Sequence, residues 1–472
     1  MNCFLRMVVL FGCALLVAGE GYASPPPKIT SSSSDDTGVY GCSLLTGVKR
    51  RSTGLGDICG LRKWMSKFGG SLTIAETSEA LGNVSGGVNQ GVEYDGLTTA
   101  TFQLNTQRAF HWYGGTFNAS ALQIHGQNLS ADNLSTLQTA SGIESDRATR
   151  LWELWYDQKL DKEGRYDIKI GQQSLDQEYM GTQNGLLYVN TMFGWAMLPS
   201  ADLPGGGPAY PLSALGARVH LRTGNSWTWL AGAYTGDASQ QNDTGTAFPL
   251  DAVLGIVELQ YSYPGLGSTV RRGSKTPLAR TYKLGAWYDN AKFSDQRYDT
   301  NGLSLANPLS NGNAKIHHGD YAFYGVIDQM LWVSNYENDR TVSVFFRPMG
   351  TPRSDRNEID FSMNAGLNFK EPIMHRDDDT FGVAMGYTHV SGSASDLDRD
   401  QRHYSNTLSY PIRSGESYIE TTYQYQYTSW WQIQPDFQYV FNPGAGLTNP
   451  KSTTGAKIGN EAVFGVRMNF AF

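Results

Sequence analysis

The last twelve residues of the chain alternate strictly, and this alternation limits the fold more than any other feature. Reading back from Phe472, every even position to 462 is apolar, whereas the odd positions include Arg467, Asn469 and Glu461. Side chains of a β-strand alternate between two faces, so the pattern predicts a strand with one apolar and one mixed face. A half-buried strand of a soluble sandwich has the same period, so other parts of the chain must decide between the alternatives.

The first 23 residues have the features of an export signal. Arg6 precedes an apolar run over residues 7–18, and Gly21-Tyr22-Ala23 supplies small residues where a signal peptidase reads. This run is too short for a membrane helix, and no other stretch reaches the roughly 18 apolar residues of a spanning helix. We expect cleavage after Ala23. A chain of this kind can cross a membrane only as a closed β-barrel, in which every backbone group is paired.

The composition fits one large barrel. Charged residues make up 17% of the chain, and there are 53 glycines in 472 residues. The fraction of charged residues is therefore lower, and that of glycine higher, than is usual in a soluble domain. The 26 tyrosines and 11 tryptophans provide rings of the kind found in interfacial girdles. No Pro-rich or charged linker divides the chain after residue 55. The net charge of −7 argues against nucleic acid as a partner.

Sixteen segments of about ten residues follow, the length that crosses a bilayer at a barrel's tilt. The sequence therefore predicts an all-β fold, a 16-stranded transmembrane antiparallel β-barrel of the bacterial outer membrane over residues 71–472. The even number places both termini on the periplasmic side. The long connections 127–149, 173–213, 291–319 and 442–460 are then extracellular, and 264–280 is long where a short periplasmic turn is expected. The predicted strands are 71–80, 97–108, 116–126, 150–160, 164–172, 214–222, 226–236, 252–263, 281–290, 320–332, 340–348, 356–369, 380–390, 416–427, 431–441 and 461–472.

Most of these strands separate an apolar face from a polar one. The apolar face must meet lipid, because Arg or Lys at the bilayer midplane costs about 2–4 kcal/mol. Strand 320–332 fits least well, since Asp328 and Tyr324 share a face with Val326 and Met330. The polar face lines the lumen, where side chains either contact a solute or pair with one another and hold the barrel's shape. The candidate contacts are Glu153, Trp155, Lys169, Arg218, His220, Glu420, Gln434, Asp436 and Arg467.

The connection 173–213 is the longest of the chain, and a loop of that length is usually functional. We expect it to fold into the lumen and narrow it, with Tyr179, Tyr188, Trp195 and the glycine turn 205–207 contributing. An outward flap is the alternative.

The segment before the first strand carries two cysteines, Cys42 and Cys59, in a chain bound for an oxidising compartment. They are candidates for a disulfide, and two separate thiols are the alternative. Residues 24–55 have the composition of a flexible periplasmic leader, and residues 56–70 of a short helix or plug segment, with an amphipathic helix over 61–68.

No pattern of catalytic or metal-binding residues stands out. The sequence lacks HExxH, GxSxG and P-loop motifs, so we expect no enzyme and no cofactor. Residues 396–400 begin like a calcium loop but lack its glycine and terminal glutamate, which favours an acidic surface loop without metal. His317 and His318 fall in a predicted outer loop.

Several segments together resemble the carbohydrate-selective porins of the OprB type, from about residue 56 to 472. The resemblance is strongest over Glu420-Thr421-Thr422-Tyr423 and over residues 433–439, and it continues to Asn442-Pro443-Gly444. Ile58-Cys59 departs from the family, which usually has Trp-Gly there. The other similar segments are 56–57, 60–62, 81–87, 151–156, 169–172, 359–361, 364–367 and 377–380.

The resemblance implies a passive outer-membrane channel for glucose and other sugars. Sugar hydroxyls both donate and accept hydrogen bonds, so a lumen of amides, carboxylates and guanidinium groups can exchange bonds with them. A non-selective general porin, or a channel for another small polar solute such as aromatic acids, is the alternative. Expected partners are sugars, membrane lipid and lipopolysaccharide, and the barrel-assembly machinery through the strand ending in Phe472. A homo-trimer and a monomer both stay open.

Overall fold

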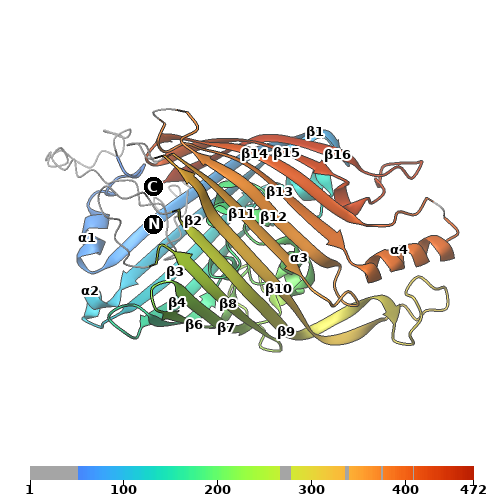
Figure 1. Ribbon diagram of the computed structural model, residues 1–472, viewed down its shortest axis with the longest axis horizontal. Helices are drawn as coiled ribbons and strands as arrows, with labels where there is room; N and C mark the ends of the chain where they lie inside the picture. Colours follow the sequence, from blue (N-terminus) through green and yellow to red (C-terminus); the bar gives the residue numbers. More distant parts are fainter. Residues whose placement is uncertain (1–50, 266–277, 335–339, 374–375, 408) are drawn as a thin grey trace, which may run out of the picture.

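Sixteen antiparallel strands close into one barrel, in which β16 returns to pair with β1 (Figure 1). The computed structural model describes residues 51–472 except 266–277, 335–339, 374–375 and 408. The prediction of a 16-stranded barrel is confirmed. The strands are β1 (Gly70–Gly87), β2 (Gly91–Asn105), β3 (Gly115–Gly126), β4 (Ala148–Lys159), β5 (Tyr166–Gln173), β6 (Ala214–Thr223), β7 (Trp227–Thr235), β8 (Val253–Tyr263), β9 (Arg280–Asp299), β10 (Ala314–Val333), β11 (Thr341–Gly350), β12 (Ile359–Lys370), β13 (Thr380–Val390), β14 (Gly415–Thr428), β15 (Trp431–Phe441) and β16 (Gly459–Ala471).

The two ends of the barrel differ. Short turns join the strands at the predicted periplasmic end, where α1 (Leu61–Lys67) and α2 (Thr106–Phe110) also lie (Figure 1). The helix predicted over 61–68 is therefore present, and it buries none of its residues. From α1, Arg62 donates a hydrogen bond to the backbone oxygen of Phe472. Most of the connection 264–280 and all of the leader to residue 50, with Cys42, lie outside the described residues, so the disulfide with Cys59 stays a prediction.

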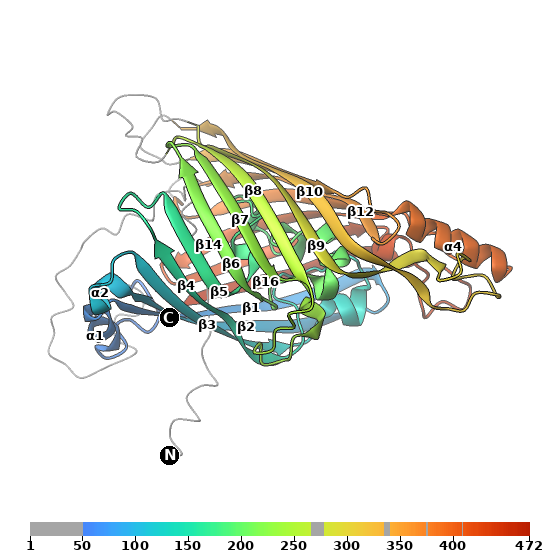
Figure 2. The ribbon, with the colours of Figure 1, turned by 90° about the horizontal axis from the view of Figure 1, so that it is seen from below.

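At the opposite end, β9 and β10 run well beyond the other strands, beside the helix α4 (Gly392–Tyr404) (Figures 1 and 2). The predicted strands 281–290 and 320–332 were too short, because β9 and β10 continue into the connection 291–319, where His317 bonds Asp295 at 2.8 Å. The expectation of an acidic loop over 396–400 was also wrong. These residues are helical, since Ser391 caps the first turn and Arg297 neutralises Asp396 and Asp400 at 2.7 and 2.8 Å.

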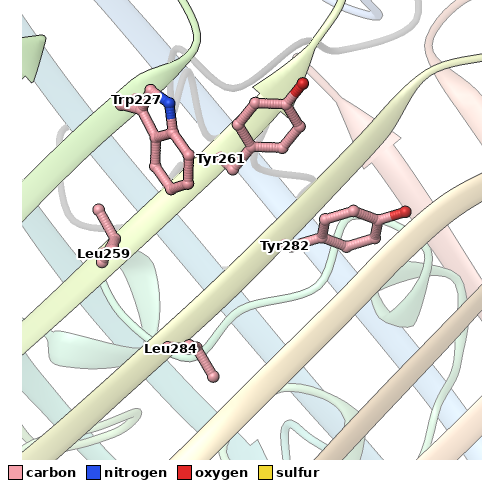
Figure 3. A pocket seen from close by; sticks show the side chains of 5 residues that line it. All are labelled: Trp227, Leu259, Tyr261, Tyr282 and Leu284. Carbon is pink, nitrogen blue, oxygen red and sulfur yellow. The ribbon is translucent and has the colours of Figure 1, made fainter.

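The outer surface is largely apolar and carries rings near the short-turn end. Trp227, Tyr261 and Tyr282 pair in register across β7, β8 and β9, and with Leu259 and Leu284 they line a shallow apolar groove (Figure 3). The groove faces outward, because Leu284 is 69% exposed. Rings at this level are typical of a membrane-interface girdle. Within the described ranges, no helix has the length and apolar character needed to span a membrane.

Candidate functional site

The connection between β5 and β6 lies inside the barrel rather than above it. It folds into short helical turns and the helix α3 (Met197–Asp202), which packs on β12. Its side chains Tyr179, Tyr188 and Trp195 are all buried. The ring of Tyr188 lies 4.6 Å from that of Phe193 and 5.7 Å from that of Phe345 on β11, measured between ring centroids. These side chains belong to an apolar cluster that also contains inward residues of β7 to β15.

This packing explains the strand that fitted the pattern least well. Tyr324, Val326 and Asp328 of β10 do share one face, and that face points into the barrel. Tyr324 and Val326 pack in the apolar cluster around the loop. Asp328 accepts a hydrogen bond from the amide of Gln183 at 2.5 Å. The inward face of β10 is therefore apolar in part because it meets protein, not water.

Three strands next to the barrel's seam hold the middle of the loop through its backbone. The carboxylate of Glu420 accepts from the amides of Val189 and Asn190 at 2.6 and 3.0 Å. Gln434 donates to the carbonyl oxygen of Leu187 at 2.6 Å. Arg467 donates to the carbonyl oxygen of Val189 at 3.2 Å and also pairs with Glu79 of β1. Asp436 lies beside them and accepts from Gln438 at 3.0 Å.

Arg347 on β11 holds a second part of the loop, and the sequence did not single it out. Its guanidinium donates to the carbonyl oxygens of Met180 and Gly194 at 3.1 and 2.8 Å, and also to that of Met192. The side chain is 1% exposed. Glu258 of β8 was missed in the same way, and it accepts from the amide of Met180 at 2.8 Å.

A charged cluster on β4, β5 and β6 holds the beginning of the loop. Glu178 of the loop pairs with Lys169 and lies 3.3 Å from Arg218. Burial alone would raise the pKa of Glu178, but Lys169 and Arg218 together hold that pKa below its usual value. Arg218 and His220 both reach Asp167, at 2.8 and 2.7 Å.

The structure therefore collects the predicted lumen residues into two groups. Glu420, Gln434, Asp436 and Arg467 lie on β14, β15 and β16, and the other five lie on β4, β5 and β6. In the second group, the ammonium of Lys169 lies 4.0 Å from the ring centre of Trp155, and Glu153 accepts from the amide of Ser174 at 3.2 Å. All nine face inward, and most of them bond the loop or one another.

A second connection, 127–147, also turns inward, although the sequence suggested only an extracellular loop. Its amides at Leu137 and Gln138 donate to the carboxylate of Glu416 on β14, at 2.9 and 2.8 Å. Leu129 and Leu134 pack with Val189 of the first loop in a small buried cluster. The two loops therefore contact each other inside the barrel. The sequence did contain one indication of this contact, because Glu416 is a carboxylate on the inward face at the end of a strand. Alternation alone, however, does not reveal which group such a carboxylate binds.

Glu144 in this second loop predicts a dependence of stability on pH. Burial raises the pKa of Glu144 to about 8, opposed by hydrogen bonds from Ser130 and increased by the nearby charges of Asp95 and Glu79. An acid with a raised pKa stabilises the folded state fully below its ordinary pKa and loses this contribution as pH rises through the folded value. We expect the barrel to lose on the order of 1 kcal/mol between pH 7 and 9 through this group.

The measurement is denaturant unfolding of the purified protein at both pH values. The variant Glu144→Gln should show a smaller difference between them, because the amide does not titrate. Equal pH dependence in the two proteins would contradict the role of Glu144.

Polar side chains of small to moderate size line part of the inner wall away from the large apolar cluster. On β2 and β3, Thr101 and Ser120 lie within hydrogen-bond distance at 2.9 Å, and Gln103 donates to Asn118 at 3.2 Å. These side chains face inward with the charged cluster of β4 to β6. The large apolar cluster therefore joins the loop to β7 to β15, whereas on β2 to β4 the loop packs Tyr210 on a smaller apolar cluster around Trp152 and the rest of that wall is polar.

Comparisons with known proteins agree with this architecture. Porin B of Pseudomonas aeruginosa is 24% identical over 428 residues, which cover 83% of this chain and 87% of porin B. The high-pH structure of Pseudomonas putida OprB matches with a TM-score of 0.78 at 21% identity, over 89% of this chain and 99% of that one. Its low-pH structure matches with a TM-score of 0.55 at 16% identity, over 89% and 98%. At such identities these structures show the fold.

The family is shown by the sequence itself. The family model described as carbohydrate-selective porin, OprB family, matches residues 89–472. This range contains every strand from β2 onward and both inward loops. The resemblance inferred from the sequence is confirmed, and the chain belongs to the OprB family of carbohydrate-selective porins, which are β-barrels of the outer membrane.

Proposed function

We propose that sugars cross the outer membrane through this protein in a passage between the inward loop 174–213 and the polar wall of β2 to β6. Family membership makes the protein a sugar-selective porin, and it implies a channel rather than an enzyme. The observation that carries the location is the asymmetry of the lumen. The loop packs its apolar side chains on β7 to β15, so a hydrated solute is better accommodated on the other side.

The chemistry of the polar wall suits a neutral polyol. Threonine, serine and asparagine side chains on β2 and β3 both donate and accept, as sugar hydroxyls do. Lys169 and Arg218 of β5 and β6 stand against Asp157 and Asp167 of the same wall and against Glu178 of the loop, so the charges largely cancel. Near-neutral pairs attract single ions weakly but still exchange hydrogen bonds with hydroxyls. The alternative role, in which these pairs only hold the barrel's shape, is distinguished by substitution.

The ring of Trp155 offers an apolar face for the C–H side of a sugar. We expect Trp155→Ala to weaken block of the ion current by glucose about tenfold, because a stacked aromatic contact contributes about 1 kcal/mol or more. Trp155→Phe should retain most of the block. Current through single channels in planar bilayers, titrated with glucose, measures this. Equal block in all three proteins would mean that the ring lines the wall without binding sugar.

The overall function is tested by flux. Proteoliposomes with the purified protein should take up glucose down its gradient without an energy source, and faster than an amino acid of similar size. Boiled protein is the matched control. Equal rates for the two solutes would favour the alternative of a non-selective general porin, and the absence of any conductance would contradict the channel.

We also propose the cellular partners. The ring girdle and the apolar outer wall would contact phospholipid and lipopolysaccharide, and the last strand would present Phe472 to the barrel-assembly machinery. Residues 1–23 would act as the signal peptide and residues 24–55 as a periplasmic leader, ahead of the segment 56–70. N-terminal sequencing of the mature protein, expected to begin at Ser24, tests the first boundary.

A further inference from the structure

Two short helices at the periplasmic end of the barrel expose large apolar side chains. The helices α1 and α2 lie side by side there (Figures 1 and 2), and Arg108 of α2 donates to the backbone oxygen of Ser66 in α1 at 2.6 Å. Trp64 of α1 is 59% exposed, and Phe110 of α2 is 69% exposed. The other exposed apolar side chains of the two helices and the turn after α2 are Leu61, Phe68, Trp112 and Tyr113. An apolar surface of this kind indicates contact with something other than water.

The helix α1 has one apolar and one basic face. Leu61, Trp64 and Phe68 recur at intervals of three and four residues, which places them on one face of a helix. The rings of Trp64 and Phe68 do lie together, with their centroids 5.4 Å apart. The same helical period places Lys63 and Lys67 on the opposite face. In a globular domain the apolar face of such a helix packs on the core, whereas α1 buries none of its residues.

The helix α1 lies against the outer side of the barrel wall. Thr101 and Gln103 of β2 line the lumen, where they lie beside polar side chains of β3, so Phe102 between them points outward. A Cβ atom at Gly70 would lie 3.4 Å from the ring of Phe102 and 3.5 Å from Cβ of Met65 in α1. These two contacts place α1 next to an outward ring at the rim of the barrel.

The segment before α1 crosses the rings of the last strand on the same outer side. Phe470 and Phe472 lie on the face of β16 opposite to Arg467, which reaches the loop in the lumen, and their rings stack on each other. A Cβ atom at Gly54 would lie 3.0 Å from the ring of Phe472 and 3.2 Å from that of Trp430. Outward rings near the end of a barrel's strands mark the membrane interface, so this segment runs at that level.

The turn after α2 continues this level. The indole nitrogen of Trp112 donates to Gln158 of β4 at 3.0 Å, and the hydroxyl of Tyr113 donates to the backbone oxygen of Asp161 at 2.9 Å. Gln158 lies on the face of β4 opposite to Trp155, which points into the lumen. Both rings therefore have their polar atom fixed by protein and much of their apolar body exposed, as rings at a membrane interface often do.

The charge of α1 matches a phosphate-bearing surface. The helix contains Arg62, Lys63 and Lys67 and no acidic residue. Lys63 lies 3.6 Å from Asp57, whereas Lys67 is exposed at the end of the helix. Lysine side chains can reach phosphate groups while their aliphatic stems stay beside apolar neighbours. Basic residues opposite a face of Trp, Phe and Leu are typical of helices that lie in the headgroup layer of a membrane.

We propose that α1, α2 and the turn after α2 bind phospholipid in the periplasmic leaflet of the outer membrane. We call Leu61, Trp64, Phe68, Phe110 and Trp112 the lipid collar. Its side chains insert below the headgroups, and the ammonium groups of α1 meet the phosphates. Phospholipid is the occupant because the lipid collar is continuous with the outward rings of β2 and β16, which already face the membrane, and because the basic face of α1 complements its charge.

Photo-crosslinking in vesicles of phosphatidylethanolamine and phosphatidylglycerol tests the proposal. The full chain carries p-benzoylphenylalanine in place of Trp64 or Phe110. Leu284, in the outward groove of β7 to β9, is the positive control. Leu309, which is 82% exposed in the connection beyond the other end of the barrel, is the matched control in water. We expect a yield of chain joined to phospholipid from positions 64 and 110 close to that from 284, and several-fold above that from 309.

Two outcomes would overturn the proposal in this experiment. One is a yield from positions 64 and 110 no higher than from 309. The other is a product that joins either position to another part of the same chain, such as the leader, because the apolar face of α1 would then be covered by protein. In native outer membranes, a product with a different protein in place of phospholipid would contradict it equally.

Charge variants test the contact with phosphate. Lys63→Gln combined with Lys67→Gln should lower the phospholipid product from position 64 several-fold and leave that from position 284 unchanged. Single-channel conductance and glucose block should stay as in the unsubstituted protein, because the lipid collar lies outside the lumen. An unchanged yield from position 64 would show that the basic face does not meet phosphate, and the headgroup placement would fail while the channel function stands.

Discussion

Removal of the middle of the inward loop should raise single-channel conductance several-fold and abolish the preference for glucose over an amino acid of similar size. The loop brings Tyr179, Tyr188, Phe193 and Trp195 into the barrel, where they pack with the inward side chains of β7 to β15. A 16-stranded barrel without such an insertion holds a wide aqueous channel. Replacing residues 185–203 with a short Gly-Ser linker removes most of this apolar filling while leaving every strand intact.

A control removes exposed chain outside the barrel instead. Residues 300–313 join β9 to β10 beyond the barrel, and their deletion should leave conductance and selectivity unchanged. The double variant Glu420→Ala with Gln434→Ala keeps the loop but removes three of its backbone hydrogen bonds. It should give larger and noisier currents. Unchanged conductance in both loop variants would show that the loop does not limit the channel.

The strands could be predicted because a membrane imposes their pattern. Lipid on one face and water or protein on the other force a period of two, and the bilayer fixes the length of the repeat. The predicted bounds of β9 and β10 were too short for the same reason. Beyond the membrane a strand does not need an apolar outer face. β9 continues to residue 299 and β10 begins at residue 314, and these outer parts need not alternate between apolar and polar residues. Part of their support comes from α4, which is distant in sequence and whose Asp396 and Asp400 pair with Arg297 of β9.

The inward face could be predicted, but not what fills the barrel. Alternation correctly placed residues such as Glu420 and Arg467 on the lumen side, yet it could not show that they bond a loop instead of facing open water. A carboxylate that meets water and one that accepts two backbone amides look the same in a sequence. Glu416 and Glu258 were missed for this reason.

Replacement of Arg347 tests most sharply whether these contacts fix the loop. Its guanidinium binds the carbonyl oxygens of Met180, Met192 and Gly194, which come from different turns of the loop. Arg347→Met keeps much of the volume but leaves these buried oxygens without donors, so we expect a loss of about 3 kcal/mol in the free energy of unfolding. Arg347→Lys should recover only part, since one ammonium cannot reach all three oxygens in the same geometry.

The loop should respond before the barrel does. Because the strands keep all their own hydrogen bonds, Arg347→Met should still insert and migrate as a folded barrel, while its single-channel current becomes noisy and its glucose block weakens. Arg280→Met, at the periplasmic end of β9 where the guanidinium lies over the ring of Tyr263, is the control and should leave both properties unchanged. A quiet channel with full glucose block in Arg347→Met would mean that apolar packing alone holds the loop, and that the buried guanidinium is dispensable for the constriction.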